Sequence, residues 1–256
     1  MNNETLIERH FARIGVEAVL VEGEAISIDV RRRAKDELFV LAMPHAAEVK
    51  LLDANRADRH LLLLVDHRGT KSRFLCGHDE RHWFVAAIPE GERGVTDVAK
   101  AKAALQPPLV RTSALGLKSK HRLRRRNRVY VRQGEWYFVP ARGYLPPASA
   151  VLRHEPLSRG QGSKPHFMEF AYRAGGTQVY VNSQHPNGLT TLEYEALPEA
   201  ERRRNSWRVM QRDAQVFAMG RITHSDHATI NLRGWHRVLM NTENRAAAMR
   251  HVAFLD

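Results

Sequence analysis

Residues 118–140, near the middle of the chain, constrain the fold more than any other stretch. The first part of this stretch carries eight lysines and arginines before Glu135 interrupts it. Cations cannot enter an apolar core without partners, so this segment must lie at the surface whatever its secondary structure. The second part is aromatic and β-branched, which predicts two strands, 128–132 and 136–140, around a tight turn at Gln133-Gly134.

Short apolar segments separated by turn residues make up much of the remaining chain. Alternating apolar and polar residues predict half-exposed strands, and short apolar runs that end at Pro44 or Pro89 predict buried ones. We therefore expect an α+β fold with several short antiparallel strands, four to five short helices and a β-rich C-terminal half. The expected strands outside the hairpin are 18–30, which divides near Gly23, and 38–43, 60–66, 72–76, 83–88, 149–154, 177–181, 216–223, 229–232 and 235–240.

Helices are predicted where helix-favouring residues or apolar residues at helical spacing follow a capping residue or a proline. Thr96 is a plausible N-cap, and Thr190 with Glu193 has the spacing of a capping box. Pro165 suits the first position of a helix that Gly175-Gly176 would end. The predicted helices are 2–16, 95–105, 166–174, 191–197 and 243–251, with a further helical stretch after Pro198.

The pair Pro107-Pro108 is the best candidate for a domain boundary, because prolines end a helix. We expect a small mixed α+β domain over residues 1–107 and a β-rich basic domain over residues 109–256. The alternative is one shared core, since a chain of 256 residues suits either arrangement.

The composition excludes several classes of protein. A hydrophobic content of 43% is enough for a core, and no apolar run approaches the roughly 20 residues that a membrane span needs. Cys76 is the single cysteine, so no disulfide forms within the chain, and the N-terminus lacks the pattern of a secretory signal. We expect a cytoplasmic protein without a membrane partner.

The net charge of +12 and the pI of about 10.3 favour a polyanionic partner. Nucleic acid is the commonest one, because phosphate contacts release condensed counterions. We expect contacts mainly to phosphates, with RNA or single strands preferred, because Tyr130 and Trp136 can stack on bases and no groove-reading helix is evident. The alternative is a basic surface without a partner. The expected cationic contacts are Lys118, Lys120, Arg122, Arg124, Arg125, Arg126, Arg128, Arg132, Arg159 and Lys164, with Arg202, Arg203 and Arg204 as an extension.

A glycine-rich loop over residues 158–164 has the ingredients of a phosphate-binding loop. Gly160 and Gly162 let the backbone approach a phosphate, and two cations add charge. These glycines are too close together for a Walker A motif, and Pro165 stands where Ser or Thr is expected. The loop therefore favours a backbone phosphate of nucleic acid over a nucleoside triphosphate, with an ordinary flexible loop as the alternative.

Histidines are the second unusual feature, since the chain has 14 of them and several cluster near the C-terminus. His224, Asp226, His227 and His236 offer imidazole and carboxylate ligands, which suit Zn²⁺ or Mn²⁺. This cluster predicts an alternative function, a metal-dependent nuclease or phosphodiesterase with His227 as the catalytic residue. The competing interpretation is a surface hairpin with polar residues at its tip.

The spacing of His227, Asn241 and His251 is similar to that of HNH-type nucleases, whose ββα-metal module consists of a strand, a loop, a strand and a helix. In that family one histidine is the general base and the others bind the metal. This sequence departs from the pattern, because the segment before Asn241 is apolar and strand-like and the bracing cysteines are absent. The resemblance implies a metal near His227.

Two further interpretations stay open. Cys76, His78 and His82 have a spacing that suits a metal or a nucleophile–base pair, although a free cysteine at a strand end is more often packed away. The third function is that of a basic subunit of a larger ribonucleoprotein or defence complex, in which the basic run contacts RNA and an apolar face contacts another protein.

Overall fold

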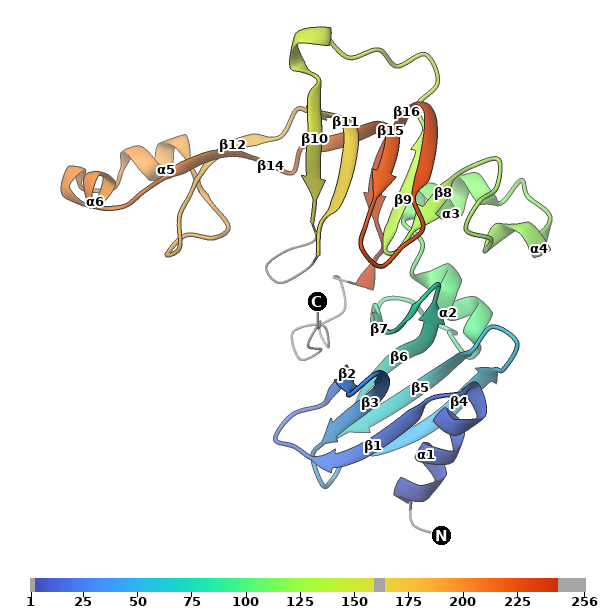
Figure 1. The fold of residues 1–256 in the computed structure, drawn as a ribbon. Coiled ribbons are helices and arrows are strands. Elements are labelled where there is room, and N and C mark those ends of the chain that lie inside the picture. Colours follow the sequence, from blue (N-terminus) through green and yellow to red (C-terminus); the bar gives the residue numbers. More distant parts are fainter. Residues whose placement is uncertain (1–2, 159–163, 244–256) are drawn as a thin grey trace.

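The computed structural model describes residues 3–158 and 164–243 (Figure 1). Strands account for 47% of it and helices for 18%, so the α+β expectation is confirmed in broad terms. The described residues form six α-helices rather than four to five, because two short helices begin unexpectedly at Pro108 and Ser119. No helix in this part of the chain is long and apolar enough to cross a membrane.

The N-terminal half contains a helix and two sheets. Strand β4 was not predicted, because Val49 is its one fully buried residue and no alternation marks it. The elements are α1 (Asn3–Ile14), a sheet in the order β1 (Glu17–Glu22), β3 (Asp36–Met43), β2 (Ser27–Arg33) with β1 parallel to β3, and an antiparallel sheet of β4 (Glu48–Asn55), β5 (His60–His67), β6 (Thr70–Asp79) and β7 (His82–Ile88).

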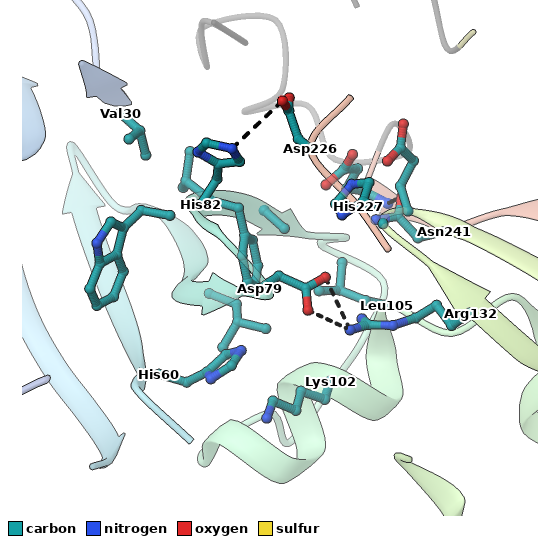
Figure 2. Close-up of a pocket in the computed structure, with 18 of the residues that line it drawn as sticks. Val30, His60, Asp79, His82, Lys102, Leu105, Arg132, Asp226, His227 and Asn241 are labelled. Carbon is teal, nitrogen blue, oxygen red and sulfur yellow. Dashed lines mark hydrogen bonds and ion pairs between the residues drawn. The ribbon is translucent and has the colours of Figure 1, made fainter. Parts of the chain in front are cut away.

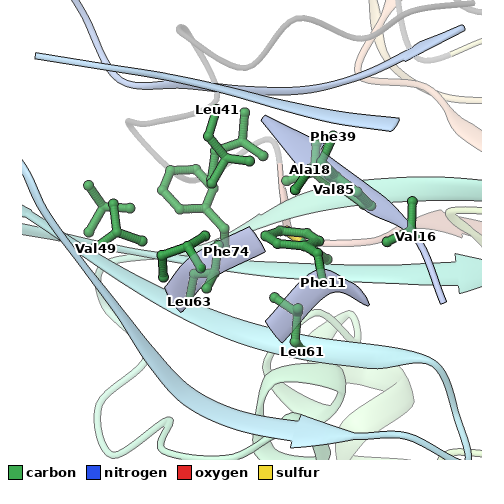
Figure 3. Packing of buried hydrophobic residues seen from close by; sticks show 14 of the residues in the cluster. Phe11, Val16, Ala18, Phe39, Leu41, Val49, Leu61, Leu63, Phe74 and Val85 are labelled. Carbon is green, nitrogen blue, oxygen red and sulfur yellow. The ribbon is translucent and has the colours of Figure 1, made fainter. Parts of the chain in front are cut away.

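Strand β5 explains the continuous apolar run in this half. Leu61, Leu63 and Val65 pack in the core that also contains Phe11 of α1 (Figure 3). Leu62, between them, belongs to a second core that β6, β7 and α2 (Val98–Ala104) complete. Both faces of β5 are therefore buried, which removes the alternation that a one-sided strand would show.

The segment that joins the two halves is helical. Asp97, and not Thr96, is the N-cap of α2, because its carboxylate accepts the backbone N–H of Lys100. Pro107 precedes α3 (Pro108–Ala114), and α4 (Ser119–Arg122) lies within the basic run. The core clusters on either side of Pro107 contain different residues. A domain boundary at this point agrees with that division and stays a prediction.

A six-stranded antiparallel sheet forms the body of the C-terminal half, in the order β10-β11-β15-β16-β9-β8 (Figure 1). The predicted hairpin is present, and it turns at Gly134-Glu135 between β8 and β9. Strand β16 combines two predicted strands through a register shift, close to which Gly234 has a φ of +85°. The strands are β8 (Val131–Gln133), β9 (Trp136–Pro140), β10 (Leu152–Leu157), β11 (His166–Ala174), β15 (Gln215–Thr223) and β16 (Ile230–Met240), with a 3₁₀ turn at Ala148–Ala150.

The helix predicted for residues 166–174 is wrong, because this segment is strand β11. It lies inside the sheet between β10 and β15. Phe167, Met168, Phe170 and Ala171 have a spacing that also suits a helix, but here it results from a register shift between Met168 and Phe170. Pairing on both edges therefore outweighs the local pattern.

Residues 177–212, which we call the arm, form a small module that extends away from the C-terminal sheet (Figure 1). Its sheet has the order β13-β12-β14, and the predicted capping box at Thr190 and Glu193 is confirmed. The predicted helix 243–251 lies outside the described residues beyond Glu243. The elements of the arm are β12 (Thr177–Val181), β13 (Leu189–Thr190), α5 (Thr191–Glu195), α6 (Glu199–Arg204) and β14 (Arg208–Arg212).

Candidate metal centre

Three histidines from two separate segments meet at one end of the C-terminal sheet. His166 begins β11, and His224 and His227 lie in the loop between β15 and β16. One possible ligand atom from each lies within 4.8 Å of the others. Strands β11 and β15 are antiparallel neighbours with Phe167 opposite Thr223, so the start of one lies beside the end of the other. Strand pairing therefore assembles a group whose members are far apart in the sequence.

The three imidazole rings stack on one another. The ring centroid of His166 lies 4.1 Å from that of His224 and 5.5 Å from that of His227, and the last two lie 4.7 Å apart. The side chain of His166 is buried, and the other two are half-buried. Nitrogen ligands of a tetrahedral zinc ion lie about 3.3 Å apart, since Zn–N bonds are about 2.0–2.1 Å long. The group must therefore contract by small side-chain rotations to hold a metal.

The hydrogen bonds of His224 fix its tautomer. Nδ1 accepts the backbone N–H of Asp226 at 3.1 Å, so Nε2 carries the proton and donates to the carbonyl oxygen of Lys164 at 3.2 Å. A metal-binding histidine commonly donates its second ring N–H to a carbonyl in this way. His224 can thus offer Nδ1 to a metal once the loop releases the N–H of Asp226.

Glu80 lies beside His227, at the tip of the β6–β7 hairpin. Its Oε2 is 3.5 Å from Nδ1 of His227 and accepts the backbone N–H of Ala228 at 2.7 Å. A carboxylate next to one ring nitrogen orients the imidazole and leaves the other nitrogen for a metal. The N-terminal half therefore supports a ligand that belongs to the C-terminal half.

The turn of the β8–β9 hairpin faces the Nε2 atoms of two of these histidines. A Cβ atom placed on Gly134 would lie 2.8 Å from Nε2 of His227 and 3.5 Å from Nε2 of His166, and the φ of Gly134 is +56°. Gln133 is buried and holds the turn against the loop by donating to the carbonyl oxygen of Ala228 at 2.7 Å. Both the backbone conformation and the space beside the imidazoles therefore require glycine.

We expect Gly134→Ala to weaken metal binding by at least about tenfold, because the methyl group would displace the ring of His227 from the geometry that its neighbours set. The same change costs about 1–3 kcal/mol of folding free energy from the positive φ alone. Isothermal titration with zinc and thermal unfolding measure the two effects. Gly143→Ala is the control, since Gly143 has a φ of +72° and open space around it. Equal loss of zinc affinity in both variants would contradict the position of Gly134 beside the imidazole of His227.

Two of the three histidines, His224 and His227, line a cavity of about 220 Å³ between the two halves of the chain (Figure 2). Strands β6 and β7 and helix α2 line it from one half, and the β8–β9 turn and the loop with His227 line it from the other. Two contacts cross it: His82 Nε2 lies 3.6 Å from Asp226 Oδ1, and Asp79 pairs with Arg132 at 3.3 Å. Ion pairs thus hold the halves together around the candidate site.

The lining of this cavity is acidic although the protein is basic. Five carboxylates and three cations line it, which leaves a charge of −2 when the histidines are neutral. Each of the three cations pairs with a carboxylate, Lys102 with Asp58, Arg132 with Asp79 and Lys164 with Asp226. Excess carboxylate beside three imidazoles favours a divalent cation over an anion. The five carboxylates are Asp29, Asp79, Glu135, Asp226 and Glu243.

Glu135 is the cavity carboxylate that stays available. Within the described parts of the chain, its side chain forms no hydrogen bond or ion pair, whereas Asp79 and Asp226 bind cations. It follows Gly134 in the hairpin turn and lines the cavity together with His224 and His227. A free carboxylate at this position can accept a proton inside the cavity.

Burial favours the neutral form of two histidines of the site, His224 and His227. It lowers the pKa of His224 and of His227, although the nearby carboxylates, Glu135 among them, act in the opposite direction. Deeper in the cavity, burial lowers the pKa of His60 to about 4. Neutral imidazole is the form that binds metals, so protons compete little with a metal at neutral pH.

The structure brings two of the four predicted metal ligands into the group. His224 and His227 are members, and Asp226 lies between them with Oδ2 2.9 Å from Lys164 Nζ. His236 is not a member of this group, and it lies inside β16 with Nδ1 2.9 Å from the carbonyl oxygen of Gly234. His166 takes its place, and no local pattern in the sequence marks it.

The basic run divides into cations that stabilise the fold and cations that are exposed. Arg125 binds both Asp79 and Glu80, and Arg132 binds Asp79. Arg122 and Arg128 donate to backbone carbonyls of the same segment. Within the described residues, the side chains of the remaining four are exposed and form no ion pair. These four are Lys118, Lys120, Arg124 and Arg126.

Base stacking by Tyr130 and Trp136 is contradicted, because their exposed fractions are 1% and 7%. The hydroxyl group of Tyr130 donates to the carbonyl oxygen of Arg122 at 2.6 Å, which holds the basic run against the core. The ring of Trp136 meets His166 edge-on at 6.5 Å and 75°. The hairpin aromatics therefore support the site and the run from within.

The remaining predicted residues have varied positions. Cys76 is buried, and burial raises the pKa of its thiol, which agrees with a packed cysteine and not with a nucleophile. His82 contacts Glu37 through Nδ1 at 2.7 Å. Arg159 and His251 lie outside the described residues, so neither the full glycine-rich loop nor the HNH spacing is tested.

No family model, curated protein or solved structure matches this chain. The function therefore has to be argued from the geometry and chemistry of the three histidines, the cavity beside them and the exposed cations.

Proposed function

We propose that the protein is a divalent-metal-dependent phosphodiesterase that acts on single-stranded nucleic acid. The observation that carries the proposal is the convergence of His166, His224 and His227, of which His224 and His227 line an acidic cavity. Three histidine ligands with an open fourth position are typical of catalytic zinc sites, whereas structural sites are closed and usually contain cysteine. Manganese is the second candidate, because the neighbouring carboxylates suit it.

A metal held by these histidines would lower the pKa of bound water to about 7. Glu135 would take a proton from that water, since it lines the same cavity and pairs with no cation among the described residues. The water oxygen would then bond to phosphorus, and the ester P–O bond would break with its electron pair on the leaving oxygen, which would take a proton from solvent. His227 is then a ligand, and Glu135 replaces it as the general base.

The position of the histidines restricts the substrate. His166 is buried, and the cavity beside it measures about 220 Å³, so a phosphate must enter a pocket to reach the metal. A base-paired duplex holds its phosphates on a stiff cylinder, whereas an unpaired strand can turn a single phosphodiester inward. Single strands and strand ends are therefore the proposed substrates.

The exposed part of the basic run supplies the affinity for a polyanion. Lys118, Lys120, Arg124 and Arg126 lie within nine residues of chain and face solvent. Arg125, within the same run, binds Glu80 beside His227, so the run is anchored next to the metal ligands. Phosphates held along this run would lead a strand toward the cavity.

Replacing these four exposed cations with alanine is expected to weaken binding of all single-stranded sequences alike. The slope of log affinity against log salt should fall by about 0.7 for each phosphate contact that is lost. Fluorescence anisotropy with labelled single strands at several salt concentrations measures the slope. The matched control replaces four exposed cations elsewhere, Arg56, Arg68, Lys71 and Arg93. An equal fall in slope for both variants would show that net charge alone attracts the strand.

The second candidate function is a nucleic-acid-binding protein without catalysis. The same four exposed and unpaired cations favour it, because they need no metal to hold phosphates. Its role as a basic subunit of a larger ribonucleoprotein or defence complex is a further possibility of the same kind. Salt-sensitive binding without cleavage would select this candidate.

Cleavage assays separate the two candidates. The chain, purified without a metal-binding tag, is incubated with labelled RNA, single-stranded DNA and duplex DNA, with zinc, with manganese and with EDTA. We expect metal-dependent cleavage of single strands and little cleavage of duplexes. Equal cleavage with and without EDTA, or none with any substrate, would overturn the proposal.

A further inference from the structure

The arm has its own sheet and helices, separate from the six-stranded C-terminal sheet to which it is connected. Its elements pack among themselves, since β12 pairs with β13 and β14, and the rings of Tyr180 and Tyr194 stack at 3.9 Å to hold α5 against β12. Two short connecting segments, near Gly176 and Ala214, join the arm to β11 and β15, and the arm extends outward from these strands (Figure 1). The arm must therefore obtain its stability from its own contacts or from another molecule.

Its own contacts are few. The arm has 36 residues, and Val179, at 2% exposure, is its one fully buried apolar residue. Modules below about 40 residues usually need a disulfide, a metal or oligomerisation to be stable. The edge-on contact of Tyr194 with Trp207 adds packing, but both rings are only half-buried. The arm lacks cysteine, and the candidate metal group found among the described residues lies outside it, which leaves a partner surface to complete its core.

The arm also exposes three large apolar side chains, of which Met210 of β14, at 49% exposure, faces the opposite side from Val209. Leu192 of α5 is 81% exposed and Val209 of β14 is 60% exposed. Val209 lies opposite Tyr180 across the strands, so it shares the face on which α5 packs. Apolar residues gathered in this way mark a contact surface more often than isolated ones do.

The charge of the arm indicates which kind of partner it binds. Its five arginines and four glutamates leave a net charge of +1, although the whole chain carries +12, so the arm attracts polyanions weakly. The charges are also segregated, because the glutamates lie between residues 193 and 201 and the arginines between residues 202 and 212. Two arms related by a two-fold axis can therefore place the acidic segment of each against the basic segment of the other.

We infer that the arm binds the arm of a second copy of this chain, through the face that carries Leu192 and Val209. Direct antiparallel pairing of two β14 edges about Met210 is disfavoured, because it would set arginines opposite arginines. Packing of the two faces instead buries the exposed apolar side chains and pairs the segregated charges. This inference does not depend on the proposed catalysis.

Sedimentation velocity over a range of protein concentrations tests the inference. We expect the wild-type chain to form a dimer, and the double variant Leu192→Lys and Val209→Lys to raise the dimer dissociation constant at least about 100-fold, because apolar burial is lost in both copies. Leu145→Lys is the control, since Leu145 is 86% exposed and lies outside the arm. Circular dichroism and thermal unfolding establish that each variant folds.

A wild-type chain that stays monomeric at every concentration would overturn the inference. A double variant that remains dimeric, or a Leu145→Lys control that dissociates as readily, would also overturn it. If the wild type is monomeric and the double variant instead binds single strands more weakly, the arm belongs to the nucleic-acid surface.

Discussion

His227→Ala is expected to abolish metal binding and to lower the rate of cleavage at least about 10³-fold. His227 is one of the three proposed ligands, and two imidazoles alone hold zinc poorly. Loss of the metal removes several kcal/mol of transition-state stabilisation, and each 1.4 kcal/mol corresponds to a factor of ten. Inductively coupled plasma mass spectrometry gives the metal content, and single-turnover cleavage of a labelled strand gives the rate.

Two histidine variants serve as controls for this result. His45→Ala removes an exposed histidine that is remote in sequence from the site and should change neither quantity. His236→Ala removes a buried imidazole that the structure places inside β16, so it should lower stability while the metal is retained. Retention of metal by His227→Ala, or its loss from His236→Ala with the fold intact, would contradict the assignment of ligands.

Glu135→Gln is expected to lower kcat about 10²–10⁴-fold, which is the usual contribution of a general base. The amide has nearly the same shape as the carboxylate but cannot take the proton of a water molecule. Metal content should be unchanged, because the proposed ligands are the three histidines, and KM should change little. Steady-state kinetics and metal analysis of the same preparation measure all three quantities.

Glu135→Asp is the conservative comparison, because it keeps the carboxylate and shortens its reach. We expect it to recover part of the rate that Glu135→Gln loses. A Glu135→Gln enzyme that retains the wild-type rate would assign the proton to another group. Loss of metal from this variant would instead make Glu135 a ligand.

Local patterns in the sequence predicted most elements of the fold. The capping box at Thr190, the hairpin at Gly134 and the buried strand β5 depend on residues close together in the chain, so the sequence displays them directly. The strand β11 could not be predicted in this way. Its apolar residues have a helix-like spacing, and only its pairing with β10 and β15 decides the conformation.

The candidate site also combines features that local sequence shows with features that only strand pairing creates. His224 and His227 lie three residues apart in one loop, so their spacing was visible, whereas His166 reaches them only because β11 pairs with β15. The role of Gly134 was equally hidden, since the sequence marks it as a turn residue and only the structure places it beside two imidazoles. Convergence of distant segments is a property of strand pairing, which a single sequence does not encode locally.

Charge and aromaticity predicted which segment lies at the surface, but not which of its side chains are exposed and unpaired. The basic run lies at the surface, as expected, but Arg125 and Arg132 are committed to carboxylates of the N-terminal half. Tyr130 and Trp136 adjoin that run and yet belong to the interior. Neighbours in the chain thus face in different directions, because a strand presents alternate side chains to opposite sides.

The metal content of the unmodified chain is the measurement to make first. The protein is purified without a metal-binding tag, equilibrated with zinc or manganese, freed of excess ion and analysed by mass spectrometry. We expect one metal ion per chain, and none when His166, His224 and His227 are all replaced with alanine. A wild-type chain that binds neither metal, or a triple variant that binds as much as the wild type, would contradict a metal centre at these histidines.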